Sequence, residues 1–223
     1  MGHRRLRNLV LAGATSALIA FSAHAQQGSP RWVVEQLNDV IENVMKESSS
    51  LGFEGRYQWL DPVIRDSFNL PFMAEVAAGR YWGRGTEEQK RLFVEAFSKM
   101  TTAIYAVRFD TYAGDTFVIQ GEEMVGQSSV LVRCQIVRSD GNRIPVHYLL
   151  RSFDGPWRIV DVYAWGKISE LTGRKETYEP ILKDEGMDVL AKSLETEVAK
   201  MRRTEALREE LSSVPGPGAR PLP

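Results

Sequence analysis

Cys134 and His147 are the first residues to consider for catalysis or metal binding, because beyond the expected leader they are the one cysteine and the one histidine of the chain. Two such ligands are too few for a zinc site of the His/Cys type. A Cys–His nucleophile pair is formally possible, but Cys134 lies in the middle of an expected strand, as a small buried hydrophobic residue does. His147 alternates with Val146 and Tyr148, which predicts that it points to the opposite face of the sheet. The chain contains no G-x-S-x-G elbow, P-loop or dinucleotide fingerprint.

Asp161 is the acid best placed for chemistry. The alternation of its strand predicts that it shares a face with Trp157, Ile159 and Tyr163. A carboxylate that points into an apolar interior can have a raised pKa and act as a general base, with Tyr148 or Tyr163 as hydrogen-bond donor. The alternative is a structural acid paired with an arginine or a backbone amide, as buried charges usually are.

The elements that would position these residues form a predicted four-stranded antiparallel sheet. The expected strands are Thr116–Glu122, Ser129–Val137, Ile144–Arg151 and Trp157–Tyr163. The connections between them are short and built around Gly126, Gly141 and Gly155. Strands joined so closely must be antiparallel neighbours, because a parallel pair needs a crossover of about a dozen residues.

The two faces of this sheet differ in polarity. One predicted face is almost wholly apolar and contains Val118, Val130, Val132, Cys134, Ile136, Val146, Tyr148, Leu150, Trp157 and Ile159. The other is mixed and contains Ile119, Arg133, Gln135, His147, Arg151 and Arg158. This pattern is typical of a sheet that helices cover on one side only. The arginine-rich face is expected to face water, with a docking surface as the alternative.

Helices account for most of the remaining chain, so the fold class is α+β. Apolar residues at three- and four-residue steps predict a first helix over Arg31–Glu47, which Ser48-Ser49-Ser50 should end. A capping box, Thr86 with Gln89, opens a long helix that reaches about Val107. Further helices are expected over Arg56–Phe68 (interrupted near Pro62), Phe72–Ala78, Lys167–Asp184 and Met187–Leu211.

Residues 1–25 have the pattern of a cleaved secretory signal peptide: three arginines, an apolar run and Ala23-His24-Ala25. No cysteine follows the cleavage position, so a lipoprotein is not indicated, and the expected location is the periplasm, with a retained anchor as the alternative. Without the leader the chain has 25 basic and 29 acidic residues, a net charge of −4, which argues against nucleic acid as a partner. The expected organisation is one domain over residues 26–211 and a disordered Pro/Gly-rich tail over 212–223.

An ordered series of motifs resembles the MlaC family, also known as the toluene-tolerance auxiliary components of ABC transporters. It includes Arg56-Tyr57-x-x-Leu60-x-Pro62, Phe68, Met73-Ala74, Gly79-Arg80-x-Trp82, Gln89, Phe93-x-x-Ala96-Phe97, Tyr105, Tyr112-x-Gly114, Val132-Arg133, Tyr148-x-Leu150, Trp157-x-x-x-Asp161-Val162, Gly166, Arg174, Ile181-Leu182 and Gly186. The likeness extends over about Val33 to Glu195. Leu149 stands where the family usually has arginine, and Ile168-Ser169-Glu170-Leu171 is closer to the hopanoid-associated branch called HpnM.

The resemblance implies a sheet-and-helix fold of the nuclear-transport-factor-like or cystatin-like type with an apolar cavity. It implies a periplasmic carrier, without catalytic groups, metal or cofactor, that binds the acyl chains of a phospholipid or a hopanoid. The implied partners are an inner-membrane ABC transporter with a substrate-binding ring and an outer-membrane lipoprotein complex. Tyr105 and Arg174 match family positions without an assigned role.

Twelve large or adaptable apolar residues are the candidates for the cavity lining: Met73, Phe93, Phe97, Met100, Ile104, Val132, Cys134, Val146, Tyr148, Leu150, Trp157 and Ile159. The same residues could instead form a plain packed core, because packing density is not visible in a sequence. Two other functions remain open: a small-molecule enzyme on the same fold that uses Asp161 as base, and an envelope adaptor that binds no ligand.

Overall fold

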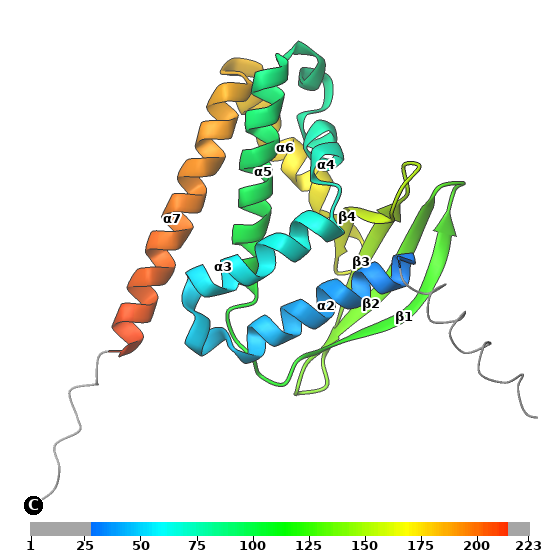
Figure 1. Cartoon of the computed structure of the whole chain (residues 1–223), viewed down its shortest axis with the longest axis vertical. Coiled ribbons are helices and arrows are strands. Elements are labelled where there is room, and N and C mark those ends of the chain that lie inside the picture. The colour runs from blue at the N-terminus through cyan, green and yellow to red at the C-terminus, as the bar shows by residue number, and fades with distance from the viewer. Residues whose placement is uncertain (1–27, 214–223) are drawn as a thin grey trace, which may run out of the picture.

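The strands form one antiparallel sheet in the computed structural model, which describes residues 28–213 (Figure 1). They are β1 (Thr116–Val125), β2 (Ser129–Val137), β3 (Arg143–Arg151), β4 (Arg158–Ala164) and β5 (Ile168–Ser169), and they pair in chain order. The first four lie where the sequence predicts them. The expectation of four strands is wrong by one, because Ile168 and Ser169 turn back to pair with Ala164 and Tyr163 before the next helix begins. The predicted leader and most of the predicted tail lie outside the described residues.

The helices are α2 (Pro30–Lys46), α3 (Ser48–Ser67), α4 (Leu70–Ala78), the 3-10 helix η1 (Gly79–Arg84), α5 (Glu87–Arg108), α6 (Glu170–Asp184) and α7 (Met187–Ser213). Local capping explains where two of them start. Ser29 accepts a hydrogen bond from the Trp32 amide ahead of α2, and the predicted capping box of Thr86 and Gln89 is formed at α5.

The second helix is longer than its sequence suggests. The three serines end α2 as expected, but they also begin α3, which kinks at Gly52, where φ is 58°, and continues through Pro62. Only glycine adopts this backbone conformation readily, which is why the change of direction falls there. The predicted interruption at Pro62 is therefore wrong, and the actual break lies ten residues earlier.

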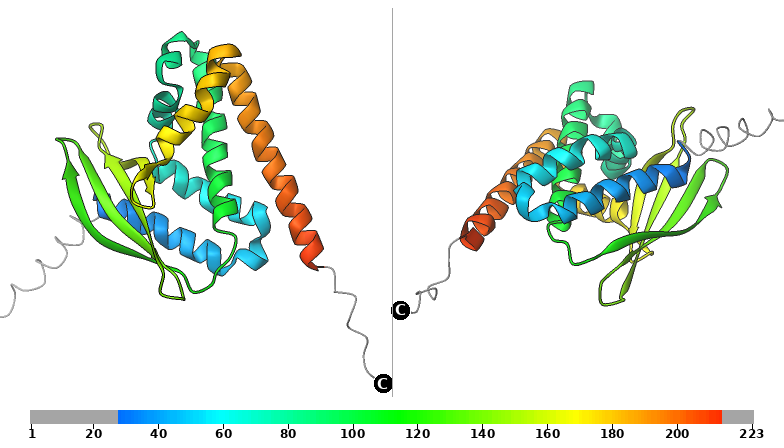
Figure 2. Two further views of the ribbon diagram at one scale, coloured as in Figure 1. Left: turned by 180° about the vertical axis from the view of Figure 1, so that it is seen from behind. Right: turned by 60° about the horizontal axis from the view of Figure 1, so that its bottom comes forward.

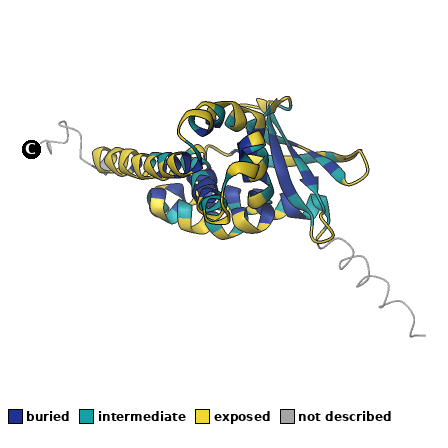
Figure 3. Ribbon diagram, turned by 90° about the horizontal axis from the view of Figure 1, so that it is seen from above, coloured by how far each residue is buried: buried dark blue, intermediate teal, exposed yellow. Residues whose placement is uncertain are grey.

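The helices differ in how they meet the sheet (Figure 2). α2 lies along one face of the sheet and contacts β1 and β2, while α3, α4 and α6 meet β4. α5 and α7 lie side by side and extend away from the sheet. Figure 3 shows buried residues along the sheet and mostly exposed residues at the C-terminal end of α7. We call the sheet face beneath α2 the inner face.

Strand register corrects the predicted inner face at β1. Ile119 lies opposite Cys134 and Phe117 opposite Ile136, so these two residues point inward. Val118 lies opposite Gln135 and is 41% exposed. The sequence assigned Val118 and Ile119 to the wrong faces because β1 has apolar residues at three consecutive positions, and alternation then leaves the register open.

A β-bulge at Val160 corrects the predicted position of Asp161. Ile159 pairs with Leu150 and Val162 with Tyr148, whereas Asp161 pairs with Leu149. The extra residue reverses the alternation, so Asp161 and Tyr163 lie on the face opposite to Ile159. The expectation that Asp161 faces the apolar interior is therefore wrong.

A buried arginine joins three helices far from the sheet. Arg56 on α3 donates hydrogen bonds to the Ala106 carbonyl at 2.9 Å and to Glu205 on α7 at 3.4 Å. The next turn of α7 adds Glu209, which accepts from the Phe53 amide at 2.7 Å, just after the kink in α3. Both ends of the Arg56–Glu205 ion pair are almost fully buried, and Arg208 on α7 also pairs with Glu205 at 3.0 Å.

Replacing Arg56 with methionine should lower the free energy of unfolding by about 3 kcal/mol, because it leaves the Glu205 carboxylate buried without this partner. Guanidinium unfolding followed by circular dichroism measures this loss. The matched control is Arg203→Met, which replaces an exposed arginine on α7, the helix of Glu205. It should change the free energy of unfolding by no more than about 0.5 kcal/mol. Equal stabilities of the two variants would contradict a structural role for the ion pair.

Candidate functional site

A polar contact fixes α2 to the middle of the inner face. Asn38 on α2 is 5% exposed, and its Nδ2 donates to the Cys134 thiol at 3.5 Å. Its Oδ1 accepts from the Tyr148 hydroxyl at 3.2 Å. Burial raises the pKa of the Cys134 thiol to about 11 and the pKa of Tyr148 well above its usual value. All three groups are therefore neutral near pH 7, and the interface between α2 and the sheet contains no charge at this point.

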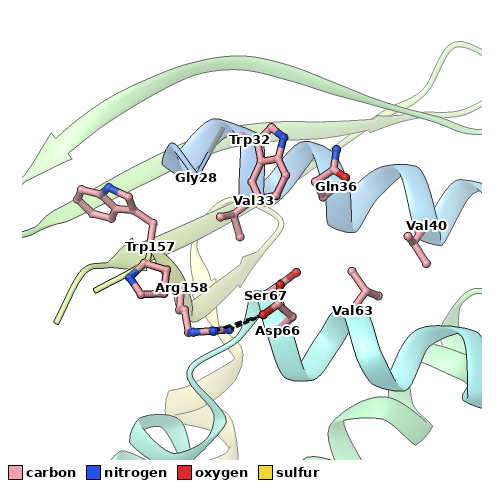
Figure 4. Close-up of a pocket in the computed structure, with 11 residues that line it drawn as sticks. Gly28, Trp32, Val33, Gln36, Val40, Val63, Asp66, Ser67, Trp157 and Arg158 are labelled. Carbon is pink, nitrogen blue, oxygen red and sulfur yellow. Dashed lines mark hydrogen bonds and ion pairs between the residues drawn. The ribbon is translucent and has the colours of Figure 1, made fainter. Parts of the chain in front are cut away.

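A pocket of about 200 Å³ opens at the N-terminal end of α2 (Figure 4). Its wall is mainly apolar: Trp32, Val33 and Val40 come from α2, Val63 from α3, and Trp157 from the segment before β4. At its edge Arg158 donates to Asp66 at 3.3 Å, which joins the start of β4 to α3. We call this the α2–α3 pocket.

A second pocket, of about 380 Å³, opens at the other end of the same interface. Ile136 and Val146 of the inner face, Met45 at the end of α2 and Phe109 after α5 supply its apolar wall. An ion pair of Arg108 and Glu170, 2.6 Å apart, borders it. We call it the Asp115 pocket, after the buried acid that also lines it.

The twelve predicted lining residues divide into two groups. Val132, Cys134, Tyr148, Leu150 and Ile159 are buried on the inner face, while Val146 lines the Asp115 pocket and Trp157 the α2–α3 pocket. The other five are on helices: Met73 on α4, and Phe93, Phe97, Met100 and Ile104 on α5.

Phe93 and Phe97 lie in a separate aromatic cluster between α5 and α6. Phe93 and Phe97 meet the Tyr178 ring of α6 at 6.1 and 6.5 Å between centroids. Arg174 lies over the Phe97 ring at 4.8 Å and donates to Thr101 at 2.8 Å. Tyr105 lies nearer the C-terminal end of α5. Its ring centroid is 5.8 Å from that of Phe68, in the segment between α3 and α4. The two family-matching positions, Tyr105 and Arg174, thus hold helices together.

Sequence reasoning missed the groups that α2 and α3 bring to the site. Asn38 occupies a position at helical spacing from Val34 and Ile41, both of which are buried. A polar residue on an apolar helix face indicates a buried hydrogen-bond partner in the fold. Val40 and Val63 carried no comparable signal, because only the packing of α2 against α3 makes them neighbours of one pocket.

The Asp161 carboxylate accepts hydrogen bonds from two backbone amides and a hydroxyl group. It accepts from the Val162 amide at 2.8 Å, from the Ser169 hydroxyl at 2.6 Å and from the Leu171 amide at 3.2 Å. Ser169 in turn caps α6 through the Thr172 amide. A negative charge at a helix N-terminus is favourable, so Asp161 has a structural task as the anchor of α6. The structure does not bring it together with Tyr148, which faces the other side of β3.

Neither a metal cluster nor a membrane-spanning helix is found in residues 28–213. No group of three or more candidate metal-ligand side chains occurs there, and no helix there is long and apolar enough to cross a bilayer.

Comparison with known proteins identifies a family and a fold. The model of the MlaC protein family matches residues 34–196. A solved structure of similar fold is described as the phospholipid-binding protein from Ralstonia solanacearum in complex with a phospholipid. It is 18% identical, with a TM-score of 0.66, and the match covers 76% of this chain and 96% of that chain. At this identity the likeness establishes the α+β fold.

Asp161→Ala should lower the free energy of unfolding by about 1–3 kcal/mol, because two amides and a hydroxyl lose their acceptor. Urea unfolding followed by tryptophan fluorescence measures the change. Glu176→Gln alters an exposed carboxylate on α6 and serves as the control, with a shift below about 0.5 kcal/mol. An Asp161→Ala protein as stable as the control would show that the acid is not needed to anchor α6.

Proposed function

The chain belongs to the MlaC family, and we propose that it is a periplasmic carrier that shelters the acyl chains of a lipid between α2 and the inner face of the sheet. The observation that carries the proposal is an apolar interface between α2 and the sheet, with neutral polar groups at its centre and an opening at each end. The fold it shares with a protein described as phospholipid-binding supports the same conclusion.

The physical task of such a carrier is to keep methylene groups out of water. Each exposed methylene is unfavourable by about 0.8 kcal/mol, so a lipid with two chains cannot cross an aqueous space unassisted. Sites for drug-sized ligands measure about 300–1,000 Å³. The two openings, of about 200 and 380 Å³, are small beside a two-chain lipid. We therefore take the structure as a closed form, in which α2 occupies part of the space that acyl chains would fill.

Displacement of α2 is feasible because its polar attachment is weak. A hydrogen bond between neutral groups contributes only about 1 kcal/mol net, and the interface has two of them, both through Asn38. Acyl chains that replace the apolar side chains of α2 on the sheet would keep the apolar inner face buried. The helices held by Arg56 and Glu205 need not move.

A phospholipid is the proposed ligand, and a hopanoid is the alternative suggested by the Ile168–Leu171 run. We further propose that the protein shuttles its lipid between an inner-membrane ABC transporter complex and an outer-membrane lipoprotein complex, as family membership suggests. The function requires no catalytic group. Asp161, on which an enzymatic alternative depends, is engaged by two amides and a hydroxyl.

A disulfide between α2 and the sheet tests the proposal. Asn38→Cys places a second thiol beside the lone Cys134, whose sulfur lies 3.5 Å from the Asn38 amide. After oxidation, the delipidated variant should lose most of its uptake of fluorescent phospholipid from vesicles, because α2 can no longer leave the inner face. Reduction should restore uptake. A titration of free thiols verifies the crosslink.

Asn38→Ser is the matched control, since it removes the amide but cannot crosslink to Cys134. It should take up lipid with or without oxidant. Uptake by the oxidised Asn38→Cys protein equal to that of its reduced form would contradict a lipid site beneath α2. If the unaltered protein neither carries lipid detectable by mass spectrometry when purified from its own cells nor takes it up from vesicles, the carrier function itself fails.

A further inference from the structure

We propose that the Asp115 pocket recognises the head group of a phospholipid that bears a primary amine. In this assignment Asp115 accepts hydrogen bonds from the ammonium group, and Arg138 binds the phosphate. The inference rests on the proposed carrier function and deepens it, because it names the lipid class that this chain prefers and the residues that select it.

Asp115 is a buried acid without a full set of partners. It is 9% exposed, stands immediately before β1 and lines the pocket. Its Oδ1 is buried and accepts no hydrogen bond in the part of the chain that the structure describes. Buried carboxylate oxygens are normally paired, so an unpaired one in a pocket wall indicates a donor supplied from outside.

Arg138 stands beside Asp115 at the same end of the sheet. Thr116 pairs with Val137, so Asp115 and Arg138 are opposite one another one step beyond the ladder. Both line the pocket, yet among residues 28–213 no ion pair joins them, and the exposed Arg138 side chain has no other acidic partner there. A guanidinium group presents a planar set of donors that matches two phosphate oxygens.

The other charges that line the pocket neutralise each other. Arg108 and Glu170 form their own ion pair at 2.6 Å. What remains is one acid just before β1 and one base just after β2, which complements a ligand with one positive and one negative group. A phosphoethanolamine head has this arrangement of charges, whereas a phosphoglycerol head has only the negative charge.

Trp165 supplies a second contact for the ammonium group. It lines the same pocket and is 62% exposed, and its backbone has a positive φ of 55°, which is uncommon and strained for a residue other than glycine. An exposed indole beside an acid can attract an ammonium group through its ring face. The apolar wall of Phe109, Ile136 and Val146 would then receive the acyl chains nearest the glycerol.

Hydrogen bonding separates this proposal from simple charge attraction. The ammonium of ethanolamine has three N–H donors, whereas the quaternary ammonium of choline has none. A buried acceptor such as Asp115 Oδ1 is satisfied by the first and left unpaired by the second. The protein should therefore favour phosphatidylethanolamine over both phosphatidylcholine and phosphatidylglycerol.

The test measures uptake of each lipid from vesicles of matched acyl composition, with bound lipid quantified by mass spectrometry. The unaltered protein should prefer phosphatidylethanolamine about tenfold, the discrimination expected from one charge-assisted hydrogen bond. Asp115→Asn should remove most of this preference. Arg138→Gln, at an exposed position, should weaken uptake of all three lipids alike, because the phosphate is common to them.

The matched control is Asp154→Asn, which makes the same change at an exposed position in the turn between β3 and β4. Asp154 has a φ of 55°, and asparagine tolerates this conformation, so the control should keep both its fold and the lipid preference.

Two results would overturn the head-group assignment while leaving the carrier function intact. One is equal uptake of the three lipids by the unaltered protein and by Asp115→Asn. The other is competition by soluble glycerophosphoethanolamine at the concentration at which the lipid binds, which would make the pocket a site for a soluble phosphoamine. Failure of every lipid to bind would instead contradict the carrier function itself.

Discussion

The apolar inner face of the sheet is the constraint on which the rest of the structure depends. Its central residues, among them Val132, Cys134 and Leu150, are fully buried, and α2 packs against β1 and β2 on this face. Removing such a surface from water is the main favourable contribution to folding, so something apolar must always lie against it. The protein can satisfy this requirement with its own helix or with a hydrocarbon chain. An exchange between the two is the physical basis of a carrier.

Different interactions fasten α3 to α7 and α2 to the sheet. Arg56 and Glu205 hold α3 to α7 with a buried ion pair, and removing one partner of such a pair is strongly destabilising. Asn38 holds α2 to the sheet with two hydrogen bonds between neutral groups, which are easily exchanged. The difference in strength suggests a rigid helical support and a movable cover. It also explains why the openings occur at the two ends of α2 and why neither is large in the closed form.

Sequence patterns predicted the local features of the fold and missed those set by long-range pairing. Glycine-containing turns located four strands, and the Thr86–Gln89 box located α5. The bulge at Val160 contains no glycine that would indicate it in the sequence. Because of this bulge, Asp161 lies on the face opposite to the predicted one. Phe93 and Phe97 are apolar at helical spacing, which predicts burial but cannot tell the sheet from α6 as the partner. The role proposed for Asp115 depends on its unpaired oxygen, which is visible only in three dimensions.

Photo-crosslinking with a phospholipid that carries a diazirine near the end of one acyl chain tests the central claim most directly. If acyl chains replace α2 against the inner face, mass spectrometry of the digested protein should find adducts on inward-facing residues of β2 and β3, such as Val132 and Tyr148, and on α2 near Leu37. Adducts confined to the outer face of the sheet, at Arg133 and Gln135, or to the exposed side of α7 would contradict it.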